Sequence, residues 1–332
     1  MVGIITIGMP IKDRIFCIDK TLASISSQTY PKNKIRIVFI DDQSNDGTYE
    51  RLLQWKEQHE KEYLGIQILR AESKGYISTL RNLCVSNMKG DIIFFWDSDT
   101  IAPDDHALSR MVQQLVGSDA VVVGFPGYRE RPSVYEKILQ AGAELGGLGF
   151  TAIKKLAFDK VGLFNEKLRV NEDTEFFARV KVNGLKVIFD TRSPCTHLKP
   201  EMPLHSSMKN GVLEYLRRVK YCFSYVPLVY GECLRAGSKP HLLRILYYFA
   251  LPPIIMLWIF DLLYPIFPVA LASLFLIAYI FLNLSYHIWR AKRNRLFGIV
   301  AFAYHVPCGL AISYGYLVKL VKRLFSCNVN PE

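Results

Sequence analysis

Long runs without a charged residue near the end of the chain restrict its fold more than any other feature. Leu262–Trp289 contains 28 consecutive uncharged residues, and Leu296–Val318 contains 23. A helix needs about 20 apolar residues to cross a bilayer, so both runs are long enough. Ile245–Phe260, with 16 uncharged residues before Asp261, is marginal. We therefore expect a transmembrane region over residues 241–332 with two to three spans.

The charge distribution agrees with this division of the chain. Lys and Arg number 41 against 30 Asp and Glu, which gives a net charge of +11. From Pro240 onward there are 8 basic and 2 acidic residues, and the basic ones border apolar runs instead of forming a polar basic surface. This pattern excludes a single soluble domain, a disordered chain and a basic DNA-binding domain, so we expect no nucleic-acid partner.

The topology follows from the short basic loop between the two long runs. This loop, Arg290–Arg295, reads RAKRNR and carries four basic residues. The positive-inside rule places it in the cytoplasm. The start of the chain, MVGIITIGMP, is typical of a buried strand and lacks the basic region of a signal peptide. We expect a multi-pass membrane protein whose N-terminal domain lies on the cytoplasmic side.

Residues 206–240, just before the apolar runs, mix Leu, Tyr, Phe and Val with basic side chains, including Arg217 and Arg218. Such a pattern is typical of an amphipathic helix that lies on a membrane surface, against anionic lipid headgroups. Periodicity alone fits a packed surface helix equally well. The position before the membrane spans favours the interfacial interpretation.

Residues 1–205 alternate between apolar strand signals and helical stretches, which predicts an α/β domain. Strand signals are VGIITIGM, IRIVFIDD, Gly65–Leu69 and DIIFFWDSD, and helices are expected around Ile15–Ser27, Asp46–Lys61 and Gly75–Met88. Near-continuous runs of β-branched and aromatic residues indicate strands that are covered on both faces, hence a mainly parallel sheet. In such sheets ligands bind at the carboxyl ends of the strands.

Two of these strands end in acidic clusters, FIDDQSNDGT and FFWDSDT. Asp46 and the pair Asp104–Asp105 are in positions where aspartate caps the next helix. Asp97 and Asp99 differ, because alternation sends both side chains to the same side of the chain at the end of a hydrophobic strand. Converging carboxylates repel each other unless a cation is present, and Mg²⁺ or Mn²⁺ bound by carboxylates and substrate phosphates fits this arrangement.

A third cluster, NEDTEFFARV, places Glu172 and Asp173 in the first turn of a predicted helix. One interpretation is a capped helix, with Asn171 or Asp173 as the cap. The other is that Asp173 is a general base, because a carboxylate near a helix start stays ionised and can accept a proton. His197, after the strand KVIFD, is either a buried histidine or a third metal ligand.

Together these motifs resemble the inverting family-2 glycosyltransferases, which have the Rossmann-like GT-A fold. The resemblance covers about Met1 to Asp190 and rests on several motifs in family order: IGMPIKDR, SISSQTYP, FIDDQSNDGT, KGYISTLRN, DSD and NEDTEFFARV. The chemistry agrees, because sugar transfer from a nucleoside diphosphate needs charge neutralisation on the leaving group and one separate base. A glycosidase needs two carboxylates flanking the bond and no metal.

The resemblance implies a role for each matching residue. Nucleotide-sugar binding is implied for Pro10, Lys12, Asp42, Arg81 and Asp97. Asp99 is implied to hold the metal and Asp173 to be the base, and His197 remains the candidate third metal ligand that its position in the sequence suggested. Glu172, Arg217 and Arg218 are expected on the acceptor or membrane side. The implied donor is a UDP- or GDP-sugar, and the implied acceptor is a hydroxyl on a lipid-linked or membrane-proximal molecule.

Two departures from the family pattern keep alternatives open. Lys12 replaces the usual aromatic residue of the first loop, and the Q-x-x-R-W motif of processive polysaccharide synthases is absent. A processive synthase and a polyprenyl-phosphate glycosyltransferase remain alternatives, and the second would not need Asp173 because its acceptor is already anionic. A membrane scaffold on an inherited transferase fold is the non-enzymatic alternative.

Overall fold

The computed structural model describes residues 3–72, 75–125, 147–190, 192, 195–198, 228–229 and 231–238. The chain divides into two units, Met1–Pro132 with Glu144–Leu204, and Ser133–Ala143 with His205–Glu332. Within the described residues, no helix has both the length and the apolar character needed to span a membrane. The expected spans of residues 241–332, and Arg217 and Arg218 of the expected interfacial segment, lie outside the described residues.

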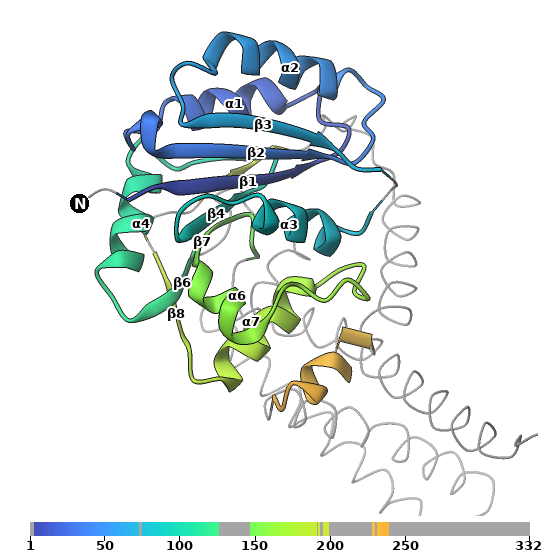
Figure 1. The fold of residues 1–332 in the computed structure, drawn as a ribbon, viewed down its shortest axis with the longest axis vertical. Coiled ribbons are helices and arrows are strands. Elements are labelled where there is room, and N and C mark those ends of the chain that lie inside the picture. Colours follow the sequence, from blue (N-terminus) through green and yellow to red (C-terminus); the bar gives the residue numbers. More distant parts are fainter. Residues whose placement is uncertain are drawn as a thin grey trace, which may run out of the picture. The chain divides into compact units, whose positions relative to one another are not determined.

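A seven-stranded mixed sheet forms the core of the first unit, with strand order β3-β2-β1-β4-β7-β6-β8 (Figure 1). Its strands are β1 (Ile5–Ile11), β2 (Ile35–Asp41), β3 (Gly65–Arg70), β4 (Ile92–Trp96), β6 (Ala120–Gly124), β7 (Phe150–Lys154) and β8 (Lys186–Phe189). Neighbouring strands are parallel except at β7, which runs antiparallel to both β4 and β6. The predicted mainly parallel α/β sheet is confirmed, and the reversed strand β7 was not predicted.

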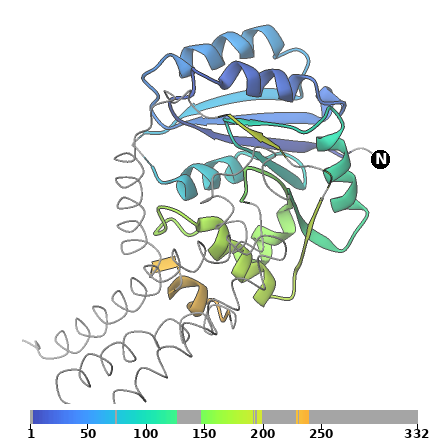
Figure 2. The same cartoon turned by 180° about the vertical axis from the view of Figure 1, so that it is seen from behind.

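Helices cover both faces of this sheet, as Figures 1 and 2 show. They are α1 (Ile18–Ser26), α2 (Thr48–His59), α3 (Ile77–Ser86), α4 (Ala107–Val116), α6 (Lys155–Val161) and α7 (Glu172–Val182). Apolar side chains of α1, α2 and α4 join one buried cluster, and those of α3, α6 and α7 join a second cluster across the sheet. The three helices that were predicted between the first strands are thus present, each with ends a few residues inside the predicted range.

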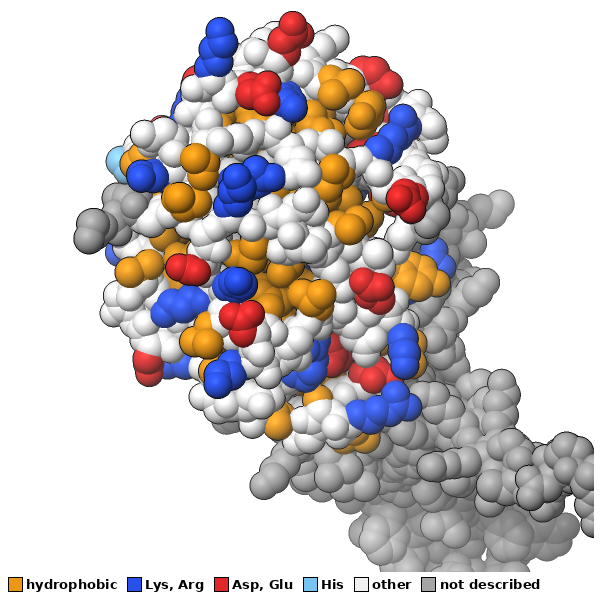
Figure 3. Space-filling model, in the orientation of Figure 1, with side chains coloured by type: hydrophobic (Ala, Val, Ile, Leu, Met, Phe, Trp, Pro, Cys, Tyr) orange, Lys and Arg blue, Asp and Glu red, His pale blue; other side chains and the backbone are white. Residues whose placement is uncertain are grey.

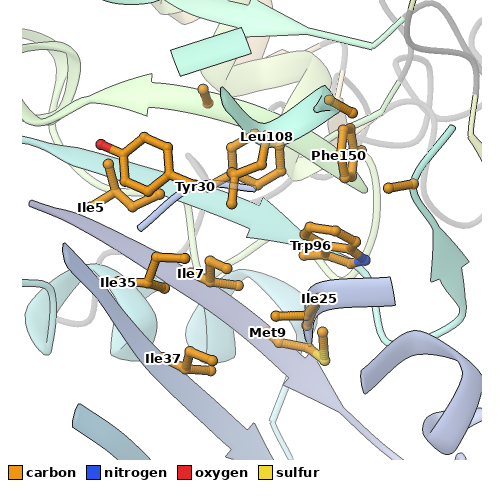
Figure 4. Close-up of a cluster of buried hydrophobic side chains, with 14 of the residues drawn as sticks. Ile5, Ile7, Met9, Ile25, Tyr30, Ile35, Ile37, Trp96, Leu108 and Phe150 are labelled. Atoms are coloured by element: carbon orange, nitrogen blue, oxygen red, sulfur yellow. The ribbon is translucent and has the colours of Figure 1, made fainter. Parts of the chain in front are cut away.

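Residues of the central strands alternate between the two clusters. In β4, Phe94 and Trp96 pack in the first cluster, whereas Ile93 and Phe95 pack in the second. Figure 4 shows the first cluster, in which the ring centroids of Trp96 and Phe150 are 4.6 Å apart in an edge-to-face arrangement. Because both faces of β4 are covered, charged residues are accommodated only after its last residue. This places the DSD segment at the carboxyl end of the sheet.

The turn before β4 fixes this strand against β1 and requires a glycine. Gly90 has a φ of +81°, and a Cβ at this position would lie 2.2 Å from the carbonyl oxygen of Ile4. Any other residue would therefore meet both backbone strain and a clash. Beside it, the Thr6 hydroxyl donates to the Lys89 carbonyl and accepts a hydrogen bond from the Lys89 N–H, both at 2.8 Å. These contacts help to fix the register of β4 against β1, and thereby the position of Asp97, which follows β4 at the sheet edge.

Most charged side chains lie on the surface, and a few are buried, mainly at the carboxyl edge of the sheet. On the face shown in Figure 3, basic and acidic side chains are interspersed with apolar ones. Exposed pairs of this kind, such as Lys186 with Asp119, contribute little to stability. The buried charged residues of the described part of the chain are Asp41, Asp42, Arg81, Glu172, Glu175 and Asp190. The first four of these belong to the carboxyl edge of the sheet, where the predicted site lies.

Candidate active site at the carboxyl edge of the sheet

Lys12 and Asp42 meet at this edge because β1 and β2 end side by side. Ile11 pairs with Asp41 in the parallel register, so the residues that follow are neighbours. Lys12 Nζ lies 2.5 Å from Asp42 Oδ2, and the Gly75 N–H donates to Asp42 Oδ1 at 2.9 Å. Lys12 is 42% exposed, whereas the Asp42 side chain is buried. Of the residues expected at the nucleotide base, these two are in contact, and Pro10 is buried within β1.

The loops after β1 and β2 are held in a strained but well-bonded conformation. Asp13 and Gln43 have φ values of 48° and 56°, a left-handed conformation that is uncommon outside glycine. Asp13 accepts a hydrogen bond from the Asn45 N–H at 3.0 Å, which ties the two loops together. Asp46 accepts from the N–H of Thr48, the first residue of α2, at 3.0 Å. Asp46 thus bonds the first amide of α2 as expected of a capping residue, although the N-cap position itself is taken by Gly47. Backbone strain like that at Asp13 and Gln43 is often found at functional sites.

The DSD turn after β4 is held through its backbone by several elements. The Asp97 N–H donates to the Gly149 carbonyl at 2.8 Å, beside the start of β7. The Ser98 carbonyl accepts from the hydroxyl of Thr21 on α1 at 3.1 Å. The Thr100 N–H donates back to the Asp97 carbonyl at 3.1 Å. Because the backbone is bonded in this way, the two flanking carboxylates remain available for other contacts.

Asp99 lies beside His197, which comes from far along the chain. Two short strands, β5 (Thr100–Ile101) and β9 (Thr196–His197), pair antiparallel and bring His197 opposite Thr100. His197 Nε2 lies 3.4 Å from Asp99 Oδ2, and Arg14 Nε lies 3.3 Å from the same oxygen. Burial alone would raise the pKa of Asp99, but the hydrogen bond from His197 and the nearby charges lower it overall. Asp99 is therefore an ionised carboxylate next to an imidazole.

Arg81 joins Asp97 to Glu172. Arg81 Nη1 forms an ion pair with Glu172 Oε1, and Arg81 Nη2 lies 3.4 Å from Asp97 Oδ1. Burial raises the pKa of Asp97 above its usual value, although the charge of Arg81 opposes this shift. We expected Glu172 on the acceptor side of the site, but the structure buries it against Arg81, with its side chain only 4% exposed.

Asp173 is the second residue of α7 and is not its N-cap. Asn171 is at the N-cap position in a left-handed conformation, φ 55°, and makes no side-chain capping hydrogen bond. Asp173 Oδ1 accepts from the N–H of Thr174 at 2.7 Å. Asp173 Oδ2 would lie 3.3 Å from a Cβ added to Gly147. The carboxylate of Asp173 thus borders the segment that enters β7, which also contacts the DSD turn through Gly149.

Arg14 is a site residue that sequence reasoning missed. It lies in the loop after β1, donates from Nη1 to the Lys12 carbonyl at 2.8 Å, and approaches Asp99 as described above. Its buried Nε faces Asp99 at 3.3 Å without forming a hydrogen bond of good geometry. A guanidinium that is only partly satisfied at such an edge fits an anionic ligand such as a phosphate. The available signal was a basic residue in IGMPIKDR, directly after the first strand and at the carboxyl edge.

The residues present fit a divalent cation in charge and in donor chemistry. The charged side chains around the DSD turn are Arg14, Arg81, Asp97, Asp99, Glu172 and Asp173, two basic and four acidic. Asp99 Oδ2 and His197 Nε2, which lie 3.4 Å apart, are the donor atoms that would hold such a cation once His197 no longer donates its proton to Asp99. Within the described residues, no three His, Cys, Asp or Glu side chains form a metal-binding group. The part of the chain that the structure describes thus supplies a partial coordination shell here.

Comparison with known proteins gives consistent matches. The model of glycosyl transferase family 2 matches residues 6–183. Glycosyltransferase AglE of Haloferax volcanii is 29% identical over 120 residues, which cover 36% of this chain and 38% of that protein. Poly-beta-1,6-N-acetyl-D-glucosamine synthase of Staphylococcus epidermidis is 23% identical over 203 residues, which cover 55% of this chain and 47% of that protein. This chain therefore spans less than half the length of these two relatives.

A solved structure shares the fold over most of both chains. The mannosyltransferase PcManGT from Pyrobaculum calidifontis, in complex with GDP-Man and Mn²⁺, has a TM-score of 0.59 at 19% sequence identity. The match covers 91% of this chain and 86% of that one. At 19% identity this likeness supports the GT-A-like fold and nothing more. Membership of a family rests on the family model, which covers more than half of the chain. The chain belongs to glycosyl transferase family 2.

Proposed function

We propose that this glycosyltransferase moves a sugar from a nucleoside-diphosphate sugar onto an acceptor hydroxyl, with inversion and with the help of a divalent cation. The observation that carries the proposal is the arrangement of Asp99 and His197, 3.4 Å apart, beside Asp97 at the carboxyl edge of the sheet. Ligands of parallel α/β sheets bind at this edge. A partial, negatively charged coordination shell there is suited to a metal–diphosphate complex.

The donor site is proposed to extend along the ends of β1, β2 and β4. Lys12 and Asp42 contact each other where the nucleotide base is proposed to lie, and Pro10 is buried in the preceding strand β1. Arg14, whose guanidinium pairs with Asp99, is proposed to contact a phosphate oxygen of the donor, and Asp97 to approach the ribose or the sugar. A UDP- or GDP-sugar is the proposed donor. PcManGT, which shares the fold, was solved with GDP-Man.

Asp99 and His197 are the residues that would hold Mg²⁺ or Mn²⁺. When bound there, such a cation neutralises charge on the departing diphosphate. Hard cations of this kind are usually held by one or two carboxylates together with substrate phosphates, which agrees with the partial shell. Asp99 is suited to this role because its pKa is lowered, so it is ionised at neutral pH.

Asp173 is the proposed general base. Its carboxylate lies in the first turn of α7 and borders Gly147, in the segment that enters β7. It would accept the proton of the acceptor hydroxyl as that oxygen attacks the sugar from the face opposite the leaving group. Asp173 accepts from Thr174 in its own turn and borders Gly147, so its described contacts include no ion pair of the kind that Asp99 makes with Arg14 and His197.

The acceptor is proposed to be lipid-linked or close to a membrane. Two uncharged runs long enough to span a bilayer follow the catalytic domain in the sequence, and Arg217 and Arg218 precede them. On this proposal the domain lies on the cytoplasmic side of a multi-pass protein and contacts anionic lipids. A processive synthase is the second candidate, because the matched relative from Staphylococcus epidermidis is named a polysaccharide synthase.

A donor screen in nanodiscs tests this proposal. The full chain is mixed with UDP- and GDP-sugars, Mg²⁺ or Mn²⁺ and a lipid-linked saccharide, and free nucleotide and product mass are measured. We expect cation-dependent nucleotide release with one donor and a product one sugar heavier than the acceptor. A ladder of masses would identify a synthase instead. Failure to release nucleotide from every donor with either cation would contradict the proposed function.

A further inference from the structure

Arg81, Glu172 and Asp97 form a buried charge cluster at the centre of the site, here called the Arg81 triad. The residues come from α3, the first turn of α7 and the end of β4. The side chains of Arg81 and Glu172 are 7% and 4% exposed, whereas that of Asp97 is 33% exposed. The triad therefore reaches from the interior to the DSD turn, and Asp97 is its accessible member.

The two carboxylates hold Arg81 unequally. Glu172 Oε1 makes the short contact to Nη1, whereas Asp97 Oδ1 lies 3.4 Å from Nη2. Arg81 Nε is buried and has no hydrogen-bond acceptor. A buried guanidinium that lacks acceptors has a large cost in free energy, so it attracts any carboxylate within reach. Glu172 satisfies most of this demand, and Asp97 is left only loosely engaged.

We infer that Glu172 is a positioning residue, which pairs with Arg81 and thereby keeps the carboxylate of Asp97 available to the donor and its cation. This inference rests on the proposed function. Without the charge of Glu172, Asp97 is the remaining carboxylate of the triad. Arg81 then pairs closely with Asp97 and neutralises it. Glu172 thus acts on the donor through Arg81 and Asp97, without touching the donor.

The ion pair between Arg81 and Glu172 gives Glu172 a different role from its neighbour Asp173. Successive residues of a helix point about 100° apart. Glu172 consequently contacts Arg81, whereas Asp173 borders Gly147. Glu172 ties the first turn of α7 to α3, which fixes the position from which Asp173 faces the site.

A second buried ion pair on α7 provides a matched control. Glu175 is as deeply buried as Glu172, and its carboxylate accepts from Arg179 Nε at 2.7 Å and from Arg179 Nη2 at 2.9 Å. Arg179 also donates to backbone carbonyls after α6, including that of Leu163 at 2.8 Å. This pair joins α7 to the chain that follows α6, away from Asp97. Glu175→Gln and Glu172→Gln both remove one buried carboxylate charge from the same helix.

Binding of UDP or GDP to the full chain, with and without Mn²⁺, tests the inference by calorimetry. We expect Glu172→Gln to weaken the Mn²⁺-linked nucleotide affinity about 10–100-fold, the range that outer-shell partners of a metal site usually show. Glu175→Gln should leave this affinity unchanged while lowering the midpoint of thermal unfolding. The double variant Arg81→Met with Glu172→Gln should bind more tightly than Glu172→Gln alone. On this inference Arg81 is the partner of the two carboxylates and makes no direct contact with the donor, so its removal only frees Asp97.

Recovery of the nucleotide affinity in the double variant distinguishes a positioning role of Glu172 from a merely structural one. If Glu172 only stabilised the fold, a second buried substitution would not restore the affinity. Affinity in Glu172→Gln equal to that in Glu175→Gln, or no recovery in the double variant, would overturn the inference while leaving the proposed function intact. A wild-type chain without Mn²⁺-linked affinity would contradict both. If Glu172→Gln loses cooperative unfolding, Glu172→Asp replaces it, with a smaller weakening in the same direction expected and an unchanged affinity again contradicting the inference.

Discussion

Replacing Asp99 by Asn should lower the rate of cation-dependent nucleotide release at least about a hundredfold, more than the loss of an outer-shell partner of a metal site. The amide keeps the size of the side chain but removes the negative charge beside His197 and Arg14. Without that charge the partial coordination shell no longer balances a divalent ion. The measurement is kcat/KM for nucleotide release as a function of Mn²⁺ concentration, with the purified full chain.

Asp104→Asn is the control for this substitution. Asp104 lies in the same segment of chain but is 42% exposed and pairs with Arg110 at the start of α4. Because an exposed pair contributes little, we expect its activity within about twofold of the wild type. An Asp99→Asn enzyme with the same rate and the same cation dependence as the control would show that Asp99 does not hold the metal.

Replacing Asp173 by Asn should lower kcat by about 10²–10⁴-fold, the usual contribution of a general base. The KM for the donor should stay within about twofold, because the described contacts of Asp173 lie in the first turn of α7 and at Gly147, away from Lys12 and Asp42. Separate measurement of kcat and of donor KM distinguishes this pattern from a loss of donor binding. Mn²⁺-linked binding of UDP or GDP should also be unchanged.

Asp159→Asn on α6, the helix that packs against α7, provides the matched control. Asp159 is exposed, so this substitution should change neither kcat nor KM. A kcat for Asp173→Asn equal to that of the Asp159 variant would contradict the role of Asp173 as base. It would point to an acceptor that needs no deprotonation, such as a polyprenyl phosphate.

The sheet was predictable because each of its main strands can be recognised from its own run of apolar residues. The runs in β1, β2 and β4 are apolar at nearly every position, and only a strand covered on both faces has that composition. The same argument placed Asp97 and Asp99 at the carboxyl edge. The direction of β7 was not predictable, because its five residues, FTAIK, show a strand but not which neighbour it pairs with.

The contacts of the site were harder to predict because they join distant parts of the chain. Arg81 and Glu172 are 91 positions apart, and no local pattern distinguishes an acid that faces an acceptor from one that pairs with a buried arginine. His197 approaches Asp99 through pairing of two strands of two residues each, too short to leave a periodic signal. Asp173 could be placed at the start of α7 from sequence, but its proximity to Gly147 depends on the packing of α7.

The most direct test of a metal-assisted nucleotide-sugar site is the thermodynamic linkage between cation and nucleotide. UDP and GDP are each titrated into the wild-type full chain by calorimetry, once with Mn²⁺ and once with EDTA. Because Asp99 and His197 form only a partial shell, we expect Mn²⁺ to raise the affinity for one of the two nucleotides at least about tenfold, and the nucleotide to raise the affinity for Mn²⁺ by the same factor. Equal affinity with Mn²⁺ and with EDTA, or no binding of either nucleotide, would contradict the account.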